Sequence, residues 1–519
     1  MPSSASAERI ALRFQLPPGG FARAQPQLPT PWWARPSGIL LVVALWAVLH
    51  AIIAAVFESA INVDDAVESY LVQSLQLSYV GRNPPLFDWL LFALQKITGP
   101  GPLSFALLRY VLLFATAMLV YQVARQAIRE PRLQALAVYS LSTLWVVGYH
   151  SHRILTHSNV MILAIVGTVL TVNALADEKR TALYAWLGVW IAAGILGKFG
   201  YLAFFGVLVI SCLLEGSYRR VLLDWRIGIS VLVAAVPLSF YAGAMIMLRQ
   251  DVVAATADVV AAARDPNLVK VLNVFAAAWI GYLLPFLAVV CLVFLPFNRG
   301  EGGREPDAEQ RALCNVLRTM IIIGTFGTMA AVLATGSVSI RDRYFHVFFL
   351  LAPVYVFAEI ERLGGWQDRT RIYLAVLLAI GVSVIGVRLA VTLWPDPRLC
   401  GRCVSAEPLA ALRPVVLKEL GDMPTLVAAD RLSAGRLRAA VPEARVVIAD
   451  EPGYRPPPRS ATGCAQITGV VNGLGALAPA RLDGATVDLW AKWWSPLMRP
   501  HRESFWQITP LAPENPLCR

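Results

Sequence analysis

Apolar stretches recur along most of the chain, separated by short polar segments. Each contains about 20 residues, enough to cross the hydrocarbon core of a bilayer as a helix. The pattern predicts an α-helical polytopic membrane protein with 11 transmembrane helices, at residues 38–57, 104–124, 133–149, 159–176, 182–197, 201–215, 227–247, 272–297, 317–336, 345–360 and 372–394.

The segment 58–103 is too polar to cross a bilayer, yet too patterned for a slack loop. Asp64, Asp65 and Glu68 place three carboxylates within one helical turn. Asp64 and Glu68 are four residues apart, so they share one face of a helix. This first outer loop is therefore expected to carry an acidic amphipathic helix.

A second short helix is expected after a break at residues 79–83. Asn83 is a suitable N-cap, Pro84 and Pro85 fit the first turn, and Asp88 would lie near the positive end of the helix dipole. We predict two amphipathic helices on the membrane surface, with acids that face a pocket.

The two ends of the chain differ from the middle. Residues 1–36 are rich in Ser, Ala, Pro and Arg without periodicity, which predicts a disordered cytoplasmic tail. Residues 395–519 alternate between helical and strand patterns, which predicts a small C-terminal α/β domain. Its expected helices are 409–420 and 431–441, and its expected strands are 425–429, 445–449, 466–471 and 505–508.

Composition supports a membrane protein, because 57% of the residues are hydrophobic and only 15% are charged. If the N-terminal tail is cytoplasmic, the inner loops carry the larger share of Arg and Lys, as the positive-inside rule requires. That rule also accounts for the net charge of +11, and no nucleic-acid-binding motif is present. An odd number of spans then places the C-terminal domain in the periplasm.

Four of the seven cysteines, Cys400, Cys403, Cys464 and Cys518, lie in that domain. An oxidising compartment favours structural disulfides over a redox role for the Cys400-x-x-Cys403 pair. Four cysteines allow three pairings, and the sequence leaves the choice open.

Several short motifs in order along the chain carry a family resemblance. They are Asp64-Asp65, Asn83-Pro84-Pro85-Leu86, Leu155-Thr156-His157, Gly197-Lys198-Phe199, and Arg343-Tyr344 with Pro353 following. Together they resemble the GT-C superfamily of membrane glycosyltransferases. The resemblance is closest to the protein O-mannosyltransferase-like bacterial branch, which includes the lipid A aminoarabinose transferase and the rhizobial lipopolysaccharide galacturonosyltransferases.

The resemblance implies that residues 37–394 form a transmembrane glycosyltransferase domain in the bacterial inner membrane, with 58–103 as its catalytic loop. It implies inverting transfer of a hexosyl or pentosyl group from a polyprenyl-phosphate donor to a lipid, glycan or protein acceptor at the periplasmic face. The family usually has Asp-Glu at Asp64-Asp65, and often His at Asn83, so the sugar stays open.

The acids supply candidates for catalysis. Asp64 is the expected general base, since a carboxylate near lipid can acquire a raised pKa; its alternative role is to cap the helix. Asp65 and Glu68 would orient the acceptor, bind a metal or simply be solvated. Asp88 is expected to be a first-turn helix charge.

The basic residues supply candidates for binding. Arg341 and Arg343 suit a phosphate, although they could anchor helix ends instead. Lys198 lies between two apolar runs, where a charge needs a partner. His157 is a candidate substrate contact. His150, His152 and His157 could join Glu68 around a divalent metal ion, but their spacing is not that of a zinc helix, so no metal ligand is assigned.

A transporter or flippase for a lipid-linked or anionic substrate is the alternative. It would place ionisable groups at mid-membrane on helices broken by Gly or Pro. Here the charges gather at the outer ends of spans, which favours the enzyme.

Overall fold

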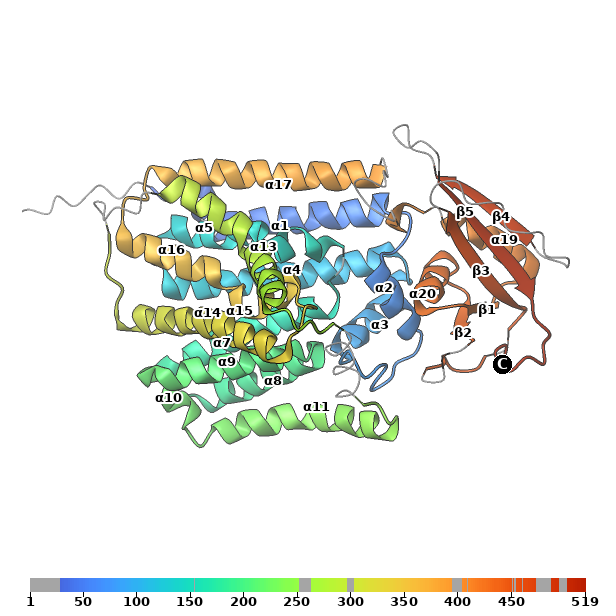
Figure 1. Cartoon of the computed structure of the whole chain (residues 1–519), viewed down its shortest axis with the longest axis horizontal. Coiled ribbons are helices and arrows are strands. Elements are labelled where there is room, and N and C mark those ends of the chain that lie inside the picture. The colour runs from blue at the N-terminus through green and yellow to red at the C-terminus, as the bar shows by residue number, and fades with distance from the viewer. Residues whose placement is uncertain are drawn as a thin grey trace, which may run out of the picture.

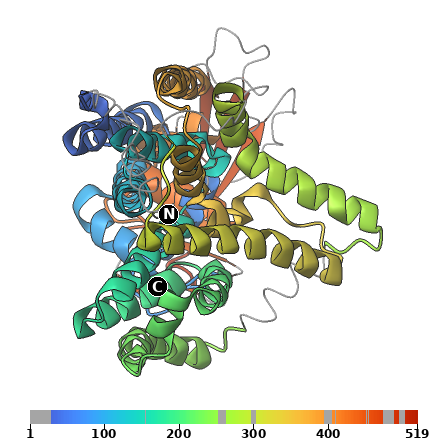
Figure 2. The ribbon, with the colours of Figure 1, turned by 90° about the vertical axis from the view of Figure 1, so that its left-hand side faces the viewer.

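The computed structural model describes residues 29–153, 155–251, 263–295, 303–393, 404–407, 409–449, 451, 454–459, 461–472, 487–493 and 502–519. Long helices run side by side along the molecule, and a sheet domain lies at one end (Figure 1). Seen along the bundle, two of the long helices, α13 and α14, lean outward from the others (Figure 2).

The helical part contains η1 (Trp32–Ala34), α1 (Pro36–Ile52), η2 (Ile53–Phe57), α2 (Val63–Leu71), α3 (Leu86–Thr98), α4 (Pro102–Ala127), α5 (Pro131–Tyr139), η3 (Ser140–Thr143), α6 (Trp145–Gly148), η4 (His150–His152), α7 (His157–Asp177), α8 (Thr181–Gly197), α9 (Gly200–Leu214), α10 (Gly216–Leu222), α11 (Ile227–Met247), α13 (Leu268–Phe294), α14 (Ala308–Thr335), η5 (Asp342–Tyr344), α15 (His346–Phe349), α16 (Ala352–Leu363) and α17 (Arg369–Leu393).

Seven helices within the described residues are long and apolar enough to cross a membrane: α1 with η2, α4, α7, α11, α13, α14 and α17. The shorter apolar helices α8 and α9 match the two predicted spans on either side of Lys198. The membrane-protein fold is confirmed, whereas 11 continuous spans are not, because two predicted spans are broken.

Hydroxyl side chains break the span predicted at 133–149. The side chains of Ser140, Ser142 and Thr143 donate hydrogen bonds to backbone carbonyls one turn earlier, and the chain tightens into η3. The span predicted at 345–360 is divided into α15 and α16, and Pro353 lies in the first turn of α16.

Part of the predicted tail is ordered. Residues 1–28 lie outside the described part of the chain, but η1 forms before α1. Ala34 is fully buried, and the Trp33 carbonyl accepts a hydrogen bond of 2.7 Å from the Tyr139 hydroxyl. The expected boundary at residue 36 is therefore several residues too late.

The C-terminal part consists of η6 (Val404–Ala406), η7 (Leu409–Ala411), α19 (Leu412–Leu420), β1 (Thr425–Ala428), α20 (Arg431–Ala440), β2 (Arg445–Ile448), β3 (Cys464–Asn472), β4 (Val487–Trp493) and β5 (Arg502–Pro510). In the described residues the sheet has five strands in the order β2-β1-β3-β5-β4. β1 pairs in parallel with β2 and β3, while β5 pairs antiparallel with β3 and β4. All the predicted helices and strands of this region are present, and β4 was not predicted.

A disulfide joins Cys464 to Cys518 and ties the end of the chain to β3. This is one of the bonds that the sequence left open. Cys400 and Cys403 lie outside the described residues.

The two predicted helices of the first loop, α2 and α3, lie between the bundle and the sheet domain (Figure 1). Their apolar faces share one hydrophobic core with that domain, including Tyr70, Phe87, Leu426, Val446 and Trp506. The loop is thus packed as an extension of the C-terminal domain.

α20 approaches α2 very closely. A Cβ added at Gly435 would lie 1.6 Å from the carbonyl oxygen of Ala66, so only glycine fits. Arg438 donates to the Ser69 carbonyl, and the Gln73 side chain both donates to and accepts from the backbone of Val446. The domain is thereby held directly against the acidic helix.

We predict that Gly435→Ala forces α20 away from α2. Overpacking of this kind costs ~1–3 kcal/mol, so the melting temperature of the purified protein should fall and cleavage between the bundle and the domain should accelerate under limited proteolysis. Gly216→Ala is the control, because a Cβ there meets no atom within 4 Å. If Gly435→Ala melts like the wild type, the contact is not as tight as the structure indicates.

Candidate active site

The acidic residues of the first loop lie along α2. Asn62 is the N-cap residue of this helix and its side chain makes no capping hydrogen bond, so Asp64 lies inside the first turn and is not the cap. The alternative role considered for Asp64 is therefore wrong. Acids in a first turn are favoured by the helix dipole, which helps α2 to form with two adjacent aspartates.

Asp65 is fully occupied by an ion pair. Its Oδ1 lies 2.6 Å from a guanidinium nitrogen of Arg109 on α4, and both side chains are 3% exposed. Burial raises the pKa of Asp65 to about 6, and Arg109 opposes the shift. This side chain ties α2 to the bundle through one of its two oxygens.

Asp64 is half-buried on the same helix turn. Burial raises its pKa, and the guanidinium of Arg343 is the main opposing influence, with a further contribution from Lys198. The structure thus brings Asp64, Lys198 and Arg343, which are far apart in the sequence, within electrostatic range of one another.

The two cations are held by different elements. Lys198 follows the C-terminus of α8 and donates a 2.9 Å hydrogen bond to Ser158. Burial and the nearby Arg343 lower the pKa of Lys198 to about 8. Arg343 lies in η5, and its buried Nε has no hydrogen-bond partner within the described residues. Both groups are therefore available to an anion.

Glu68, one helical turn beyond Asp64, contacts His157 at the start of α7. The distance from His157 Nε2 to Glu68 Oε1 is 3.0 Å, and that to Asp88 Oδ1 is 3.8 Å. Burial alone would raise the pKa of Glu68, but the imidazole lowers it overall. Burial and the Glu68 carboxylate raise the pKa of Asp88 well above its usual range.

Asp88 is the main site residue that sequence reasoning missed. It does lie in the first turn of α3, as expected, but its side chain is 1% exposed and faces Glu68 and His157. An aspartate among Phe87, Trp89 and Leu91 is a signal that could have indicated burial.

The three clustered histidines separate in space. His150 pairs with Asp342 at 3.3 Å, and His152 stacks on His50 with ring centroids 4.1 Å apart. Only His157 reaches Glu68. A metal site built from all three histidines is therefore excluded by the geometry of the described residues.

A buried polar layer lies beneath the acids. Arg388 on α17 donates to Tyr110 at 2.9 Å, lies 2.7 Å from His50 Nδ1, and forms an ion pair of 3.2 Å with Glu58 at the start of the loop. Arg388 was not predicted as part of the site, although a charged residue inside an apolar span indicates a functional or structural role.

Asn83 and Arg341 do not join the acids through any contact in the described part of the chain. Asn83 pairs with Val80 in an isolated bridge, and the N-cap of α3 is Pro85, so the predicted capping role is wrong. Proline can occupy the cap because its φ is already close to helical. Arg341 is exposed and precedes η5.

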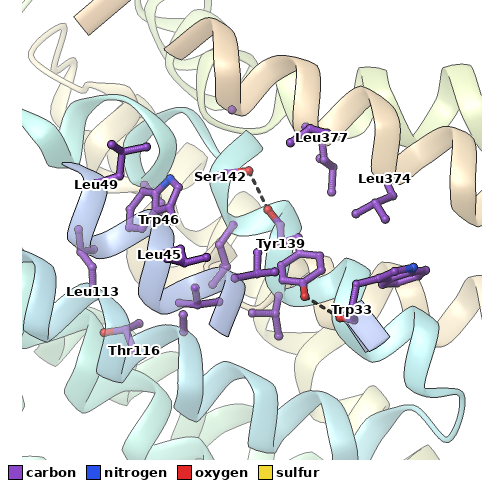
Figure 3. Close-up of a pocket in the computed structure, with 18 of the residues that line it drawn as sticks. Trp33, Leu45, Trp46, Leu49, Leu113, Thr116, Tyr139, Ser142, Leu374 and Leu377 are labelled. Carbon is purple, nitrogen blue, oxygen red and sulfur yellow. Dashed lines mark hydrogen bonds between the residues drawn. The ribbon is translucent and has the colours of Figure 1, made fainter. Parts of the chain in front are cut away.

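A separate cavity of about 400 Å³ opens between α1, α4, α5 and α17 (Figure 3). Its wall is almost wholly apolar and includes Trp33, Leu45, Trp46 and Leu377. The Trp46 ring also lies 4.9 Å from His50, so the cavity reaches the polar layer. Its lining suits a hydrocarbon chain and offers no catalytic group.

The described residues form a polytopic helical bundle with a small sheet domain at one end, and acids and cations gather near the place where the two meet. The structure is similar to the crystal structure of ArnT from Cupriavidus metallidurans bound to undecaprenyl phosphate, with a TM-score of 0.54 and 12% identity over 80% of this chain and 87% of that one. That likeness shows the shared fold.

Sequence comparison finds similarity to named glycosyltransferases. Residues 82–242 match the family described as dolichyl-phosphate-mannose-protein mannosyltransferase. The chain is 25% identical to the lipopolysaccharide core galacturonosyltransferase RgtA of Rhizobium johnstonii, over 79% of this chain and 82% of the relative. It is 24% identical to RgtB of the same organism, over 81% and 84%. The predicted resemblance to the GT-C glycosyltransferases is confirmed.

Proposed function

We propose that this enzyme transfers a sugar from a polyprenyl-phosphate donor to a hydroxyl group of an acceptor at the periplasmic face, with inversion. The observation that carries the proposal is that Arg343 and Lys198 lie within electrostatic range of the half-buried Asp64. The lipid phosphate bound by the related ArnT structure supports the donor class. The names of the relatives make a lipopolysaccharide core the first acceptor to test.

In this reaction the ionised Asp64 accepts the proton of the acceptor hydroxyl. The hydroxyl oxygen attacks the anomeric carbon from the face opposite the phosphate, and a new C–O bond forms as the bond to the phosphate oxygen breaks. The leaving electron pair stays on the polyprenyl phosphate. A single displacement of this kind inverts the anomeric configuration.

Arg343 and Lys198 stabilise the departing phosphate. Positive charge placed where negative charge develops lowers the barrier, especially away from bulk water. Arg343 can offer two parallel N–H donors to a phosphate, whereas Lys198 acts as a point charge. Asp65 positions α2 through Arg109 and takes no direct part.

The apolar cavity among α1, α4, α5 and α17 suits part of the lipid chain of a substrate, since its wall carries almost no polar groups. The lipid would then approach the site from within the bilayer, while the acceptor approaches from the side of the sheet domain. This arrangement supports transfer at the membrane surface.

Asp64→Asn should abolish transfer while donor binding persists. A positioned base contributes roughly 100- to 10,000-fold in rate, and Asn cannot accept the proton. The measurement is transfer of labelled sugar to lipopolysaccharide core by the purified protein, with donor binding measured separately. Asp265→Asn is the control, because this acid pairs with Lys270 and is not among the charged groups that act on Asp64.

The pH profile provides a second readout of the same base. Activity should fall as the pH falls through the pKa of Asp64, because only the ionised carboxylate accepts a proton. Since burial raises that pKa, the decline should begin above the pH of about 4 that is typical of an exposed aspartate. Substantial activity in Asp64→Asn would exclude this residue as the base.

Arg343→Lys should lower the rate even though the charge is kept, because one ammonium cannot reproduce the paired donors of a guanidinium. Arg343→Gln should lower it further and move the acidic limb of the pH profile upward, since the main influence opposing the raised pKa of Asp64 is lost. Equal activity of Arg343→Lys and the wild type would assign Arg343 to anchoring at the membrane surface.

A fusion of alkaline phosphatase to the C-terminus should be active in cells, because the proposed orientation exports residues 395–519. A green fluorescent protein fusion at the same position should stay dark. The reverse pattern would place the site at the cytoplasmic face.

A further inference from the structure

Three side chains from three separate elements converge next to the proposed base. Glu68 lies on α2, Asp88 on α3 and His157 on α7. One ligand atom from each lies within 4.8 Å of those from the other two. The exposed fractions of the side chains are 5%, 1% and 2% respectively, so the cluster is closed to bulk solvent.

Most of the oxygen and nitrogen atoms of this cluster lack a hydrogen-bond partner. Both carboxylate oxygens of Asp88, Oε2 of Glu68 and Nδ1 of His157 are buried and unpartnered within the described residues. Buried polar atoms are nearly always satisfied in folded proteins. Two adjacent acids beside one imidazole therefore need either a bound cation or a proton on one of the acids.

We propose that Glu68, Asp88 and His157 bind one divalent transition-metal ion, zinc or manganese. Two carboxylate oxygens and one imidazole nitrogen are a donor set that these metals accept, while the imidazole disfavours magnesium and calcium. Three protein ligands leave at least one coordination position open, as in catalytic metal sites. The ion would neutralise the two acids and join α2, α3 and α7.

The ion would position the proposed base, a role that rests on the proposed function. Glu68 is one helical turn from Asp64 on the same face of α2, so an ion that fixes Glu68 would also fix the position of Asp64. The same site can alternatively be neutralised by a proton on Asp88. The two states differ in metal content, which can be measured without substrate.

The test uses the full-length protein in detergent, stripped with a chelator and dialysed separately against ZnCl₂ and MnCl₂. We expect about one ion per chain by mass spectrometry of the metal content. Asp88→Asn and His157→Gln should each weaken the affinity at least ~10-fold, since even outer-shell changes weaken metal sites by 10- to 100-fold. Asp342→Asn is the matched control, because it alters a histidine-aspartate pair outside the cluster, and should bind like the wild type.

Two readouts on the wild type cover the case in which a variant does not fold. Added Zn²⁺ should raise the melting temperature, because a ligand that binds the native state stabilises it. Added Co²⁺ should give visible absorption bands typical of bound cobalt. Wild-type protein that retains no metal and shows neither effect would overturn the site and leave the protonated cluster.

The outcomes also separate this inference from the proposed function. Metal binding without sugar transfer would contradict the function and keep the site. Transfer by Asp88→Asn at the wild-type rate, with the same metal content as the wild type, would contradict the site and keep the function.

Discussion

The constraint on which this structure depends is the burial of four acids in one short stretch of chain. Asp65, Glu68 and Asp88 are almost inaccessible, and Asp64 is half-buried. Carboxylates in such surroundings persist only with partners or with altered protonation. Asp65 pairs with Arg109 and Glu68 contacts His157, both on helices of the bundle, so the loop cannot form its native arrangement without the bundle.

The sheet domain completes this arrangement from the other side. The core that contains Tyr70 and Phe87 also contains Trp506, although these residues come from opposite ends of the chain. Gly435 allows the backbone of α20 to touch that of α2. The acids are therefore fixed between the bundle and the sheet domain. Under the proposed function, a small displacement of either one would alter the distances over which Asp64 accepts a proton.

The sequence predicted the elements better than their contacts. Apolar runs located nearly all the helices, and the alternating patterns after residue 404 located four of the strands that the structure describes. The helix breaks near Ser140 and Pro353 were not predicted, because hydropathy is averaged over a window in which one polar residue or proline has little effect. Partners such as Arg388 and His50 are 338 residues apart, and no local pattern encodes that pairing. The burial of Asp88 likewise depends on contact with α7, and the spacing of residues within α3 does not predict that contact.

The charges at the site divide into those that are paired and those that remain available. Arg109 is committed to Asp65, and His157 lies against Glu68, so these residues fix the position of α2. Lys198 and Arg343 form no ion pair within the described residues; the hydrogen bond of Lys198 goes to a neutral hydroxyl. Asp64 lies within electrostatic range of both cations without pairing directly with either one. Buried cations that lack a directly paired counter-ion are costly, and under the proposed function the donor phosphate would supply one. The arrangement that stabilises the loop thus leaves Lys198 and Arg343 without ion pairs, as the anionic leaving group of the proposed reaction requires.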